Sequence, residues 1–275
     1  MKCDITASIV IYKNNIDMLQ KAINSFLDTS LSVKIFLVDN SPDDSLKMLK
    51  NNDKRIDYIF NNDNIGFGAG HNIAIKKSIE TEALYHIVLN PDVYFETGTI
   101  EKLFDYAKKN LDIGILVPKT LYPNGDLQFL CRMLPTPFDF FAKRLIPNFL
   151  IYFFKNRLDA YEFKSRNYDD TMEVPFLSGC FMLIKIEVLK EIGLFDENIF
   201  MYTEDIDLTR RVFMKYKTIY YPRAEIFHGY ERGSTKNIKL FWISIKSSFY
   251  YFNKWGWFWD KNRDEINNKV LTQFK

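Results

Sequence analysis

The fold of this chain is decided by its opening stretch, in which residues 5–40 read ITASIVIYKNNIDMLQKAINSFLDTSLSVKIFLVDN. Residues 5–12 and 33–38 are rich in β-branched side chains, which favour strands. Between them, residues 17–27 carry apolar side chains at helical spacing. Strand, helix and strand in this order predict two parallel strands joined by a crossover helix.

The same alternation continues and predicts an α/β fold with a Rossmann-like, mostly parallel sheet flanked by helices. Further strands are expected at residues 55–60, 84–89 and 113–117, and further helices at residues 45–51, 69–79 and 99–108. Ligands of open parallel sheets bind beyond the carboxyl ends of the strands. Three places lie there: Asp39-Asn40, residues 61–72 and Asn90-Pro91-Asp92.

Composition limits the classes of protein. The 275 residues are 47% hydrophobic, which suits one large α/β domain, alone or with an appendage. The formal net charge of +2 gives no overall field that would attract nucleic acid. Three cysteines without a C-x-x-C spacing favour neither a disulfide framework nor a structural zinc site, and predict a reducing cytoplasm. No signal peptide or spanning helix is expected, since no uncharged apolar stretch of about 18 residues occurs.

The second half of the chain is less regular. Residues 122–126 are typical of a hairpin turn, and residues 135–161 form a basic, aromatic insertion. A strand at 180–184, a helix at 204–216 and a short strand at 218–221 follow. We expect one domain over residues 1–235 and a C-terminal, aromatic, helical segment over residues 236–275.

Asn90-Pro91-Asp92 ends a predicted strand, and its carboxylate has two explanations. An Asn-Pro-Asp turn can arise from Asx-turn chemistry alone. A carboxylate at a strand end is also a hard oxygen ligand for Mg²⁺ or Mn²⁺, which in turn holds a diphosphate. In that case Asp92 is the metal ligand and Asn90 a polar helper.

Gly66, Gly68 and Gly70 stand between a predicted strand and a predicted helix. His71 breaks the G-x-G-x-x-G spacing, so a dinucleotide-binding fold is a weak match. Glycine lets the backbone approach a nucleotide phosphate, and a helix N-terminus attracts anions. A glycine-rich connector is the alternative.

Glu204, Asp205 and Asp207 open a predicted helix, where the macrodipole favours acids without any function. Asp207 can pair with Arg210 or Arg211 and is expected to be structural. Asp205 can take a proton from a sugar hydroxyl if it faces a cleft. The spacing leaves open which of Glu204 and Asp205 does so.

His228 is a third candidate. A lone histidine is more often a packed or solvated side chain than a ligand. Near Asp92 in space, however, it would complete an oxygen and nitrogen site for Mn²⁺ or Mg²⁺.

Taken in order, these motifs resemble those of family 2 glycosyltransferases, and look most like the rhamnosyltransferase branch. The resemblance covers about residues 5–230, and the ordered set is more specific than any one motif. It implies a GT-A fold and an inverting transfer from a nucleotide-diphosphate sugar. The motifs are SIVIY (8–12), VDNS (38–41), NIGFGAGHN (64–72), LNPDV (89–93), SGCFMLI (178–184), GLFD (193–196) and YTEDIDL (202–208).

Carried over residue by residue, the resemblance implies that Asp205 is the general base and that Asp92 and His228 bind Mg²⁺ or Mn²⁺. Two departures stand out: Asn90 replaces the first Asp of the usual Asp-x-Asp motif, which weakens the expected metal site, and His71 stands where many relatives have Arg. The residues expected to bind the nucleotide sugar are Asp39, Asn40, Asn64, Gly66, Phe67, Asn72, Asn90, Asp92, Gly179 and Glu204.

The reaction implied by the resemblance moves L-rhamnose from dTDP-rhamnose to a lipid-linked glycan, in the synthesis of a bacterial surface polysaccharide such as O-antigen or capsule. Another donor sugar (galactofuranose, glucose or galactose) and a non-catalytic module that binds nucleotide sugars or glycans are the alternatives. A sugar-phosphate nucleotidyltransferase also uses an α/β sheet, yet its early Gly-rich Arg/Lys signature is missing.

Residues 238–259 predict where the acceptor is met. They are rich in aromatic side chains and carry Lys239, Lys246 and Lys254 but no acid. Such a segment suits a membrane interface, whereas a packed C-terminal helix is the alternative. We expect a cytoplasmic protein at the inner face of the plasma membrane, with a polyprenyl-diphosphate-linked saccharide as acceptor.

Overall fold

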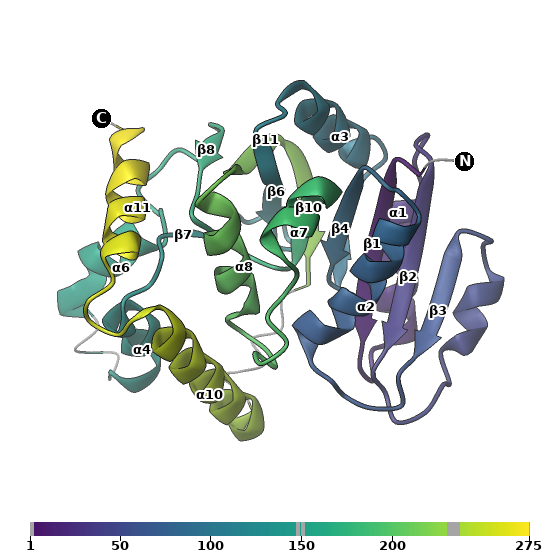
Figure 1. The fold of residues 1–275 in the computed structure, drawn as a ribbon, viewed down its shortest axis with the longest axis horizontal. Coiled ribbons are helices and arrows are strands. Elements are labelled where there is room, and N and C mark those ends of the chain that lie inside the picture. The colour runs from purple at the N-terminus through teal and green to yellow at the C-terminus, as the bar shows by residue number, and fades with distance from the viewer. Residues whose placement is uncertain (1–2, 147–148, 150–151, 230–236, 275) are drawn as a thin grey trace.

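The computed structural model describes residues 3–146, 149, 152–229 and 237–274, in which a central sheet carries helices on both faces (Figure 1). In these residues the sheet has nine strands in the order β3-β2-β1-β4-β10-β6-β11-β5, with β8 beside β11. The strands are β1 (Ile5–Ile11), β2 (Val33–Asp39), β3 (Ile56–Phe60), β4 (Tyr85–Leu89), β5 (Val93–Tyr94), β6 (Ile113–Leu121), β8 (Met172–Glu173), β10 (Phe181–Lys185) and β11 (Lys217–His228). A separate pair joins β7 (Cys131–Arg132) to β9 (Phe176–Leu177).

Among the strands of five or more residues most neighbours are parallel, as the sequence predicts, whereas the two-residue strands β5 and β8 run antiparallel to β11. β1 runs parallel to β2 and β4, β2 to β3, and β6 to β11. β10 instead runs antiparallel to β4 and β6. Its amino end therefore lies at the same edge of the sheet as the carboxyl ends of β1, β2 and β4, and this brings Gly179 to that edge.

Alternate strand residues point into apolar clusters on the two faces. Ile87 of β4 lies in one cluster with α1 (Ile16–Leu27) and α3 (Thr99–Lys109). Val88 lies in the other with α7 (Ile186–Ile192) and α8 (Glu204–Phe213), which α2 (Phe67–Glu80) joins through Ile75. The sheet is covered on both faces, as hydrophobic parallel strands require.

Local signals account for several element boundaries. Asn15 caps α1, because its Oδ1 accepts the N–H groups of Asp17 and Met18 at 2.9 and 3.1 Å. The helix expected at 45–51 is a short 3₁₀ turn, η1 (Lys47–Asn51). β11 is longer than expected and reaches His228, because it pairs along β6 as far as Leu121.

The described part of the aromatic insertion is helical. It forms α4 (Pro137–Leu145), η2 (Tyr152–Phe154) and α6 (Lys155–Tyr161), whereas residues 147–148 and 150–151 lie outside the described residues. The ring centroids of Phe140 and Phe141 lie 6.2 and 6.1 Å from that of Phe252. The insertion therefore packs against α10 (Ile238–Trp255).

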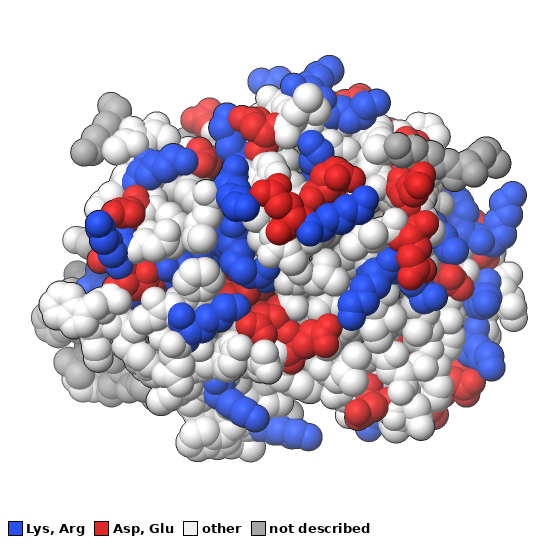
Figure 2. Space-filling view, viewed as in Figure 1, with Lys and Arg blue, Asp and Glu red and all other residues white. Residues whose placement is uncertain are grey.

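The C-terminal helices have one packed face and one exposed face. Tyr251 and Phe252 of α10, with Ile266 and Val270 of α11 (Lys261–Thr272), lie in the second apolar cluster. Other aromatic side chains stay exposed, and the lower end of α10 shows basic but no acidic side chains (Figure 2). None of the helices in the described ranges combines the length and the apolar character that crossing a membrane requires. The exposed large apolar side chains of this segment are Ile238, Trp242 and Phe249 of α10, and Phe258 and Trp259 between α10 and α11.

Candidate functional site

Two of the three places expected to face a ligand are joined by hydrogen bonds, and the third is bonded to the start of β10. Asn40 Nδ2 donates to the carbonyl oxygen of Gly66 at 3.2 Å, and Asn61 Nδ2 donates to Asn40 Oδ1 at 2.7 Å. The N–H of Asn90 donates to the carbonyl oxygen of Cys180 at 2.9 Å, which ties β4 to the start of β10. Asp39-Asn40 and residues 61–72 therefore lie side by side, and Asn90 lies beside Cys180.

Asp39 is buried at the end of β2. Its Oδ1 accepts the N–H of Ser41 at 2.8 Å, and its Oδ2 accepts the hydroxyl of Tyr58 at 2.6 Å. Burial and the neighbouring carboxylate raise the pKa of Tyr58, so its hydroxyl keeps its proton and donates. Sequence reasoning missed Tyr58, which lies on β3 beside β2.

The three glycines are explained by close packing against protein. A Cβ on Gly66, whose φ is +93°, would lie 2.5 Å from the carbonyl oxygen of Phe200. A Cβ on Gly68 would lie 2.9 Å from the Cβ of Phe195, and a Cβ on Gly70 would lie 2.8 Å from Cγ2 of Val10. The backbone thus approaches β1 and the 195–200 segment. Asn64 supports this turn by accepting the N–H of Gly66 at 3.3 Å.

Asn72 fastens the segment before α8 to α2. Its Nδ2 donates to the Phe195 carbonyl and to Glu197 Oε1, each at 2.9 Å, and its Oδ1 accepts the N–H of Phe195 at 3.0 Å. The side chain is 1% exposed. Its geometry supports a positioning role, and direct contact with a nucleotide stays a prediction.

A buried chain of hydrogen bonds links β4 to His71 of α2. His86 Nδ1 lies 2.9 Å from Thr6 Oγ1 and 2.8 Å from Ser78 Oγ. Ser8 Oγ lies 2.7 Å from His86 Nε2 and 2.6 Å from His71 Nδ1. Burial lowers the pKa of both rings, that of His86 to about 3. His71 is therefore a neutral core residue bonded to β1.

Asp92, which lies beyond the end of β4, meets His228, the last residue of β11. Asp92 Oδ1 lies 3.4 Å from His228 Nε2, and the N–H of Gly229 donates to the Asp92 carbonyl at 3.0 Å. A carboxylate oxygen and an imidazole nitrogen this close fit a divalent cation such as Mn²⁺. Among the side chains that the structure describes, no three or more of His, Cys, Asp and Glu gather into a metal cluster.

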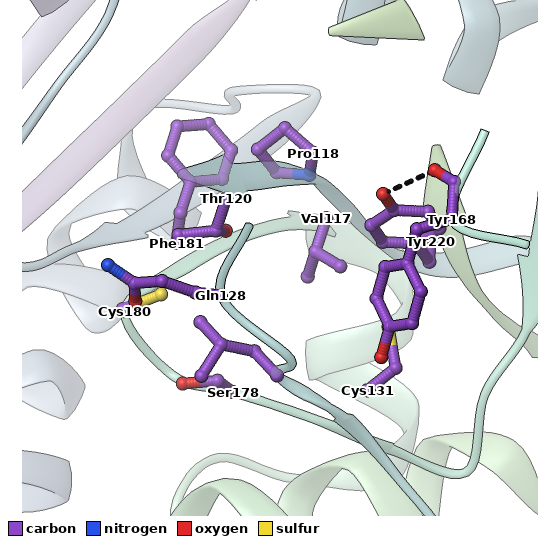
Figure 3. A pocket seen from close by; sticks show the side chains of 11 residues that line it. Val117, Pro118, Thr120, Gln128, Cys131, Tyr168, Ser178, Cys180, Phe181 and Tyr220 are labelled. Atoms are coloured by element: carbon purple, nitrogen blue, oxygen red, sulfur yellow. Dashed lines mark hydrogen bonds between the residues drawn. The ribbon is translucent and has the colours of Figure 1, made fainter. Parts of the chain in front are cut away.

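Gln128 holds His228 and was missed from the sequence. Its Oε1 lies 3.0 Å from His228 Nδ1, and its Nε2 donates to the His228 carbonyl at 2.8 Å. Gln128 also lines a cavity of about 10 Å³ behind the site, beside Thr120 and Cys180 (Figure 3). That volume suits one water molecule rather than a sugar. The available signal was a lone polar residue in the apolar run 127–130.

Glu204 and Asp205 begin α8 and face different groups. Asp205 Oδ2 accepts the N–H of Gly179 at 3.0 Å, and Oδ1 accepts that of Ile206 at 2.9 Å. Glu204 Oε2 accepts the N–H of Thr203 at 2.9 Å. Burial raises the pKa of both carboxyl groups, and the charge of Asp205 raises that of Glu204 further. Glu204 is therefore the group that keeps its proton, and Asp205 ionises first.

Asp207 is structural, as the sequence predicts. Its Oδ2 accepts Arg211 Nε at 2.9 Å. Its Oδ1 lies 2.8 Å from Lys254 Nζ and accepts Trp255 Nε1 at 2.9 Å. Arg210 instead donates to Asp260 at 2.7 and 2.6 Å. The helix that carries Asp205 is thereby fixed to α10.

The arrangement matches a known class of fold. A structure described as "Crystal structure of GalNAc-T7 with UDP, GalNAc and Mn2+" aligns with a TM-score of 0.60 and 16% identity, over 84% of this chain and 45% of that one. This likeness concerns the fold alone. It confirms the expected α/β architecture, which is that of the GT-A glycosyltransferases.

The sequence places the chain within that class. The family described as "Glycosyl transferase family 2" matches residues 8–193, and the chain belongs to this family.

Curated relatives from two bacterial species are named rhamnosyltransferases. "N-acetylglucosaminyl-diphospho-decaprenol L-rhamnosyltransferase" of Mycobacterium tuberculosis (strain CDC 1551 / Oshkosh) is 30% identical over 143 residues, which are 52% of this chain and 46% of that protein. "Rhamnosyltransferase WbbL" of Escherichia coli (strain K12) is 26% identical over 269 residues, 94% of this chain and 97% of that protein. The chain spans about half of the mycobacterial relative and nearly all of the E. coli one.

Proposed function

We propose that the protein is a hexosyltransferase that moves L-rhamnose from dTDP-rhamnose to a hydroxyl of a lipid-linked glycan, with inversion at the anomeric carbon. The observation that carries the proposal is the position of Asp205, bonded to Gly179 at the sheet edge where Asp39 and Asp92 also lie. Membership of the family supports glycosyl transfer. The names of the two relatives support rhamnose as the sugar, and the diphospho-decaprenol in the mycobacterial name supports a lipid-linked acceptor.

Asp205 is the base of a single displacement. The acceptor oxygen forms a bond to the anomeric carbon while its proton passes to the Asp205 carboxylate. The bond from that carbon to the diphosphate oxygen breaks, and its electron pair leaves with the nucleoside diphosphate. Burial raises the pKa of Asp205, which makes its ionised form a stronger base than a solvated aspartate.

The donor site lies along the ends of β1 to β4. Asp39, held by Tyr58, contacts the nucleoside, and Asn40 joins it to the turn at Gly66. Asn64, Phe67 and Asn90 line the nucleotide, and Gly179 and Glu204 lie on the sugar side, whereas Asn72 acts through the 195–197 segment.

Asp92 and His228 would hold Mg²⁺ or Mn²⁺. Such an ion, when bound, neutralises the charge that develops on the departing diphosphate. The imidazole and the carboxylate lie 3.4 Å apart, and Gly229 fixes the backbone of Asp92 beside the ring. With Asn90 in place of a second acid, the metal dependence is expected to be weaker than with two carboxylates.

The acceptor is met at a membrane surface. α10 exposes Trp242 and Phe249 beside Lys239 and Lys246, a combination that suits an interface with anionic lipid. α8, which carries Asp205, is bonded to this helix through Asp207 and Lys254. We propose that residues 236–275 rest on the inner face of the plasma membrane, where a polyprenyl-diphosphate-linked saccharide reaches the site in residues 1–235.

A panel of nucleotide sugars tests the proposal. The purified chain is incubated with dTDP-rhamnose, UDP-galactofuranose, UDP-glucose and UDP-galactose, with and without a polyprenyl-diphosphate glycan, and free nucleoside diphosphate is measured. We expect slow release from dTDP-rhamnose alone and faster release with the acceptor. Faster release from another donor would contradict rhamnose as the sugar. Binding of a donor without release of nucleoside diphosphate would favour a non-catalytic module.

A further inference from the structure

Gln128 contacts both the imidazole ring and the backbone carbonyl of His228, although the two residues are 100 positions apart. Its Oε1 lies 3.0 Å from Nδ1 of the ring, and its Nε2 lies 2.8 Å from the His228 carbonyl oxygen. Gln128 is 3% exposed and His228 4%. The ring is thus held by a buried side chain rather than by solvent.

The orientation of the Gln128 amide is fixed by the backbone around it. Nε2 donates to the His228 carbonyl and also to the Leu121 carbonyl at 3.3 Å. If the amide were flipped, its oxygen would face these two carbonyl oxygens, and because neither can donate, both hydrogen bonds would be lost. Oε1 must therefore face the ring, and because Oε1 only accepts, His228 Nδ1 must carry a proton.

The position of Gln128 is itself rigid. Its N–H donates to the Thr120 carbonyl at 2.9 Å, and the preceding residue, Leu127, forms a bridge with Leu121 at the end of β6. β6 in turn pairs with β11 up to Phe227, the residue before His228. Gln128 lies outside the strands, but backbone contacts tie it to β6, and His228 ends the neighbouring strand β11, so both partners have fixed backbone positions.

The consequence falls on the other ring nitrogen. When Nδ1 carries the proton of a neutral imidazole, Nε2 presents a lone pair. Nε2 is the atom that lies 3.4 Å from Asp92 Oδ1. A lone pair and a carboxylate oxygen facing each other at this distance offer a cation two ligands of the kind that Mn²⁺ accepts.

We propose that Gln128 is a positioning residue that fixes the Nδ1–H tautomer of His228, so that Nε2 is free of a proton and can bind a divalent cation beside Asp92. The inference rests on the proposed function for its cation, but the tautomer is a property of the protein without donor or metal. Outer partners of this kind typically change metal affinity by about 10- to 100-fold when they are removed.

The tautomer can be observed directly by nitrogen NMR. The chain has three histidines, so protein labelled with ¹⁵N-histidine gives three imidazole patterns, and His228→Asn identifies the one of interest. At about pH 8.5, where free imidazole is neutral, wild-type His228 should show a protonated Nδ1 and a bare Nε2. Gln128→Met keeps the volume but removes the acceptor, and should move the proton partly or wholly to Nε2.

Gln273→Met is the matched control. Gln273 also clamps backbone, since its Oε1 accepts the N–H of Glu173 at 2.9 Å and its Nε2 donates to the Glu173 carbonyl at 2.8 Å. It lies at the end of α11, away from His228, so this variant should keep the wild-type tautomer. A bare Nδ1 or a doubly protonated ring in the wild type, or an unchanged tautomer in Gln128→Met, would overturn the inference.

Metal affinity gives the second readout. Free Mn²⁺ is counted by electron paramagnetic resonance in the presence of dTDP, and Gln128→Met should bind about 10- to 100-fold more weakly than wild type and Gln273→Met. Equal affinity in all three would contradict the metal role of the tautomer. If the wild type has the Nδ1–H tautomer but does not bind Mn²⁺, the proposed cation site is wrong. The proposed sugar transfer is then decided separately by the donor panel.

Discussion

The backbone N–H of Gly179 donates to Oδ2 of Asp205 at 3.0 Å, across 26 positions of sequence. The bond exists because β10 runs against its neighbours, which puts the residues before its first strand position beside the start of α8. It orients the Asp205 carboxyl and favours its ionised form, while burial raises its pKa. Glu204, one residue earlier, faces Thr203 instead.

Transfer is expected to slow as the pH falls through the raised pKa of Asp205. Only the ionised carboxylate can take the acceptor proton, and burial places its pKa above the ordinary aspartate value of about 4. The profile of kcat/KM against pH should therefore show an acid limb whose midpoint lies above about 4. A limb at the ordinary value would mean that a solvated carboxyl, and so a different base, controls the rate.

His86 is expected to make the fold sensitive to acid. Its pKa in the folded protein is about 3, below the value of about 6.5 in an unfolded chain, so the unfolded state binds more protons between these values. The stability that His86 contributes is therefore present above pH of about 6.5 and is lost at up to about 1.4 kcal/mol per pH unit below it.

Urea unfolding of the wild type and of His86→Asn at several pH values checks this sensitivity. The variant should be less stable at pH of about 8, because it disturbs the bonds to Ser8 and Ser78. The difference in unfolding free energy between the wild type and His86→Asn should become smaller as the pH falls. Parallel profiles would show that His86 does not titrate below its ordinary range.

The exposed rings of α10 are expected to bind lipid. Trp242→Ser with Phe249→Ser should weaken flotation on vesicles containing anionic phospholipid by at least about 10-fold, since each ring contributes roughly 1.5–3 kcal/mol when buried. Leu111→Ser is the control, because Leu111 is 69% exposed but lies between α3 and β6. Point substitutions are preferable to removing the helices, which would uncover Tyr251 and Phe252. Wild-type protein that stays with the unbound fraction would refute membrane attachment.

Arg210→Met is expected to destabilise the whole chain. Arg210 and Asp260 lie at 2.6 Å with side chains 1% and 4% exposed, and losing one partner of a buried pair costs about 3–5 kcal/mol. Lys261→Met breaks the exposed pair with Glu265 and should cost less than about 1 kcal/mol. Equal unfolding midpoints would indicate that α11 is not packed as part of the core.

Much of the fold is predictable because its signals are local. The side-chain periodicity of residues 5–40 predicts a strand, a helix and a strand. The bounds of the observed β1, α1 and β2 agree with this prediction to within a residue or two. Acidic residues at strand ends likewise predicted where Asp39 and Asp92 would lie. The rule needs only the direction of the parallel strands.

Other features depend on contacts between distant segments. The run 180–184 predicts a strand, but nothing in it encodes that β10 runs antiparallel, and so the role of Gly179 as a donor to Asp205 could not be derived. The glycines at 68 and 70 suggested a phosphate loop, yet the side chains of Phe195 and Val10 account for them. Gln128, Lys254 and Asp260 find their partners only through tertiary packing.

The central claim is that Asp205 takes the proton of the acceptor hydroxyl. Its most direct test compares the turnover of wild type, Asp205→Asn and Glu204→Gln with dTDP-rhamnose and a polyprenyl-diphosphate glycan, together with donor binding and thermal unfolding of each. Asp205→Asn should fold and bind donor, yet transfer sugar about 10²- to 10⁴-fold more slowly, while Glu204→Gln loses less. Near-normal turnover by Asp205→Asn would contradict the claim.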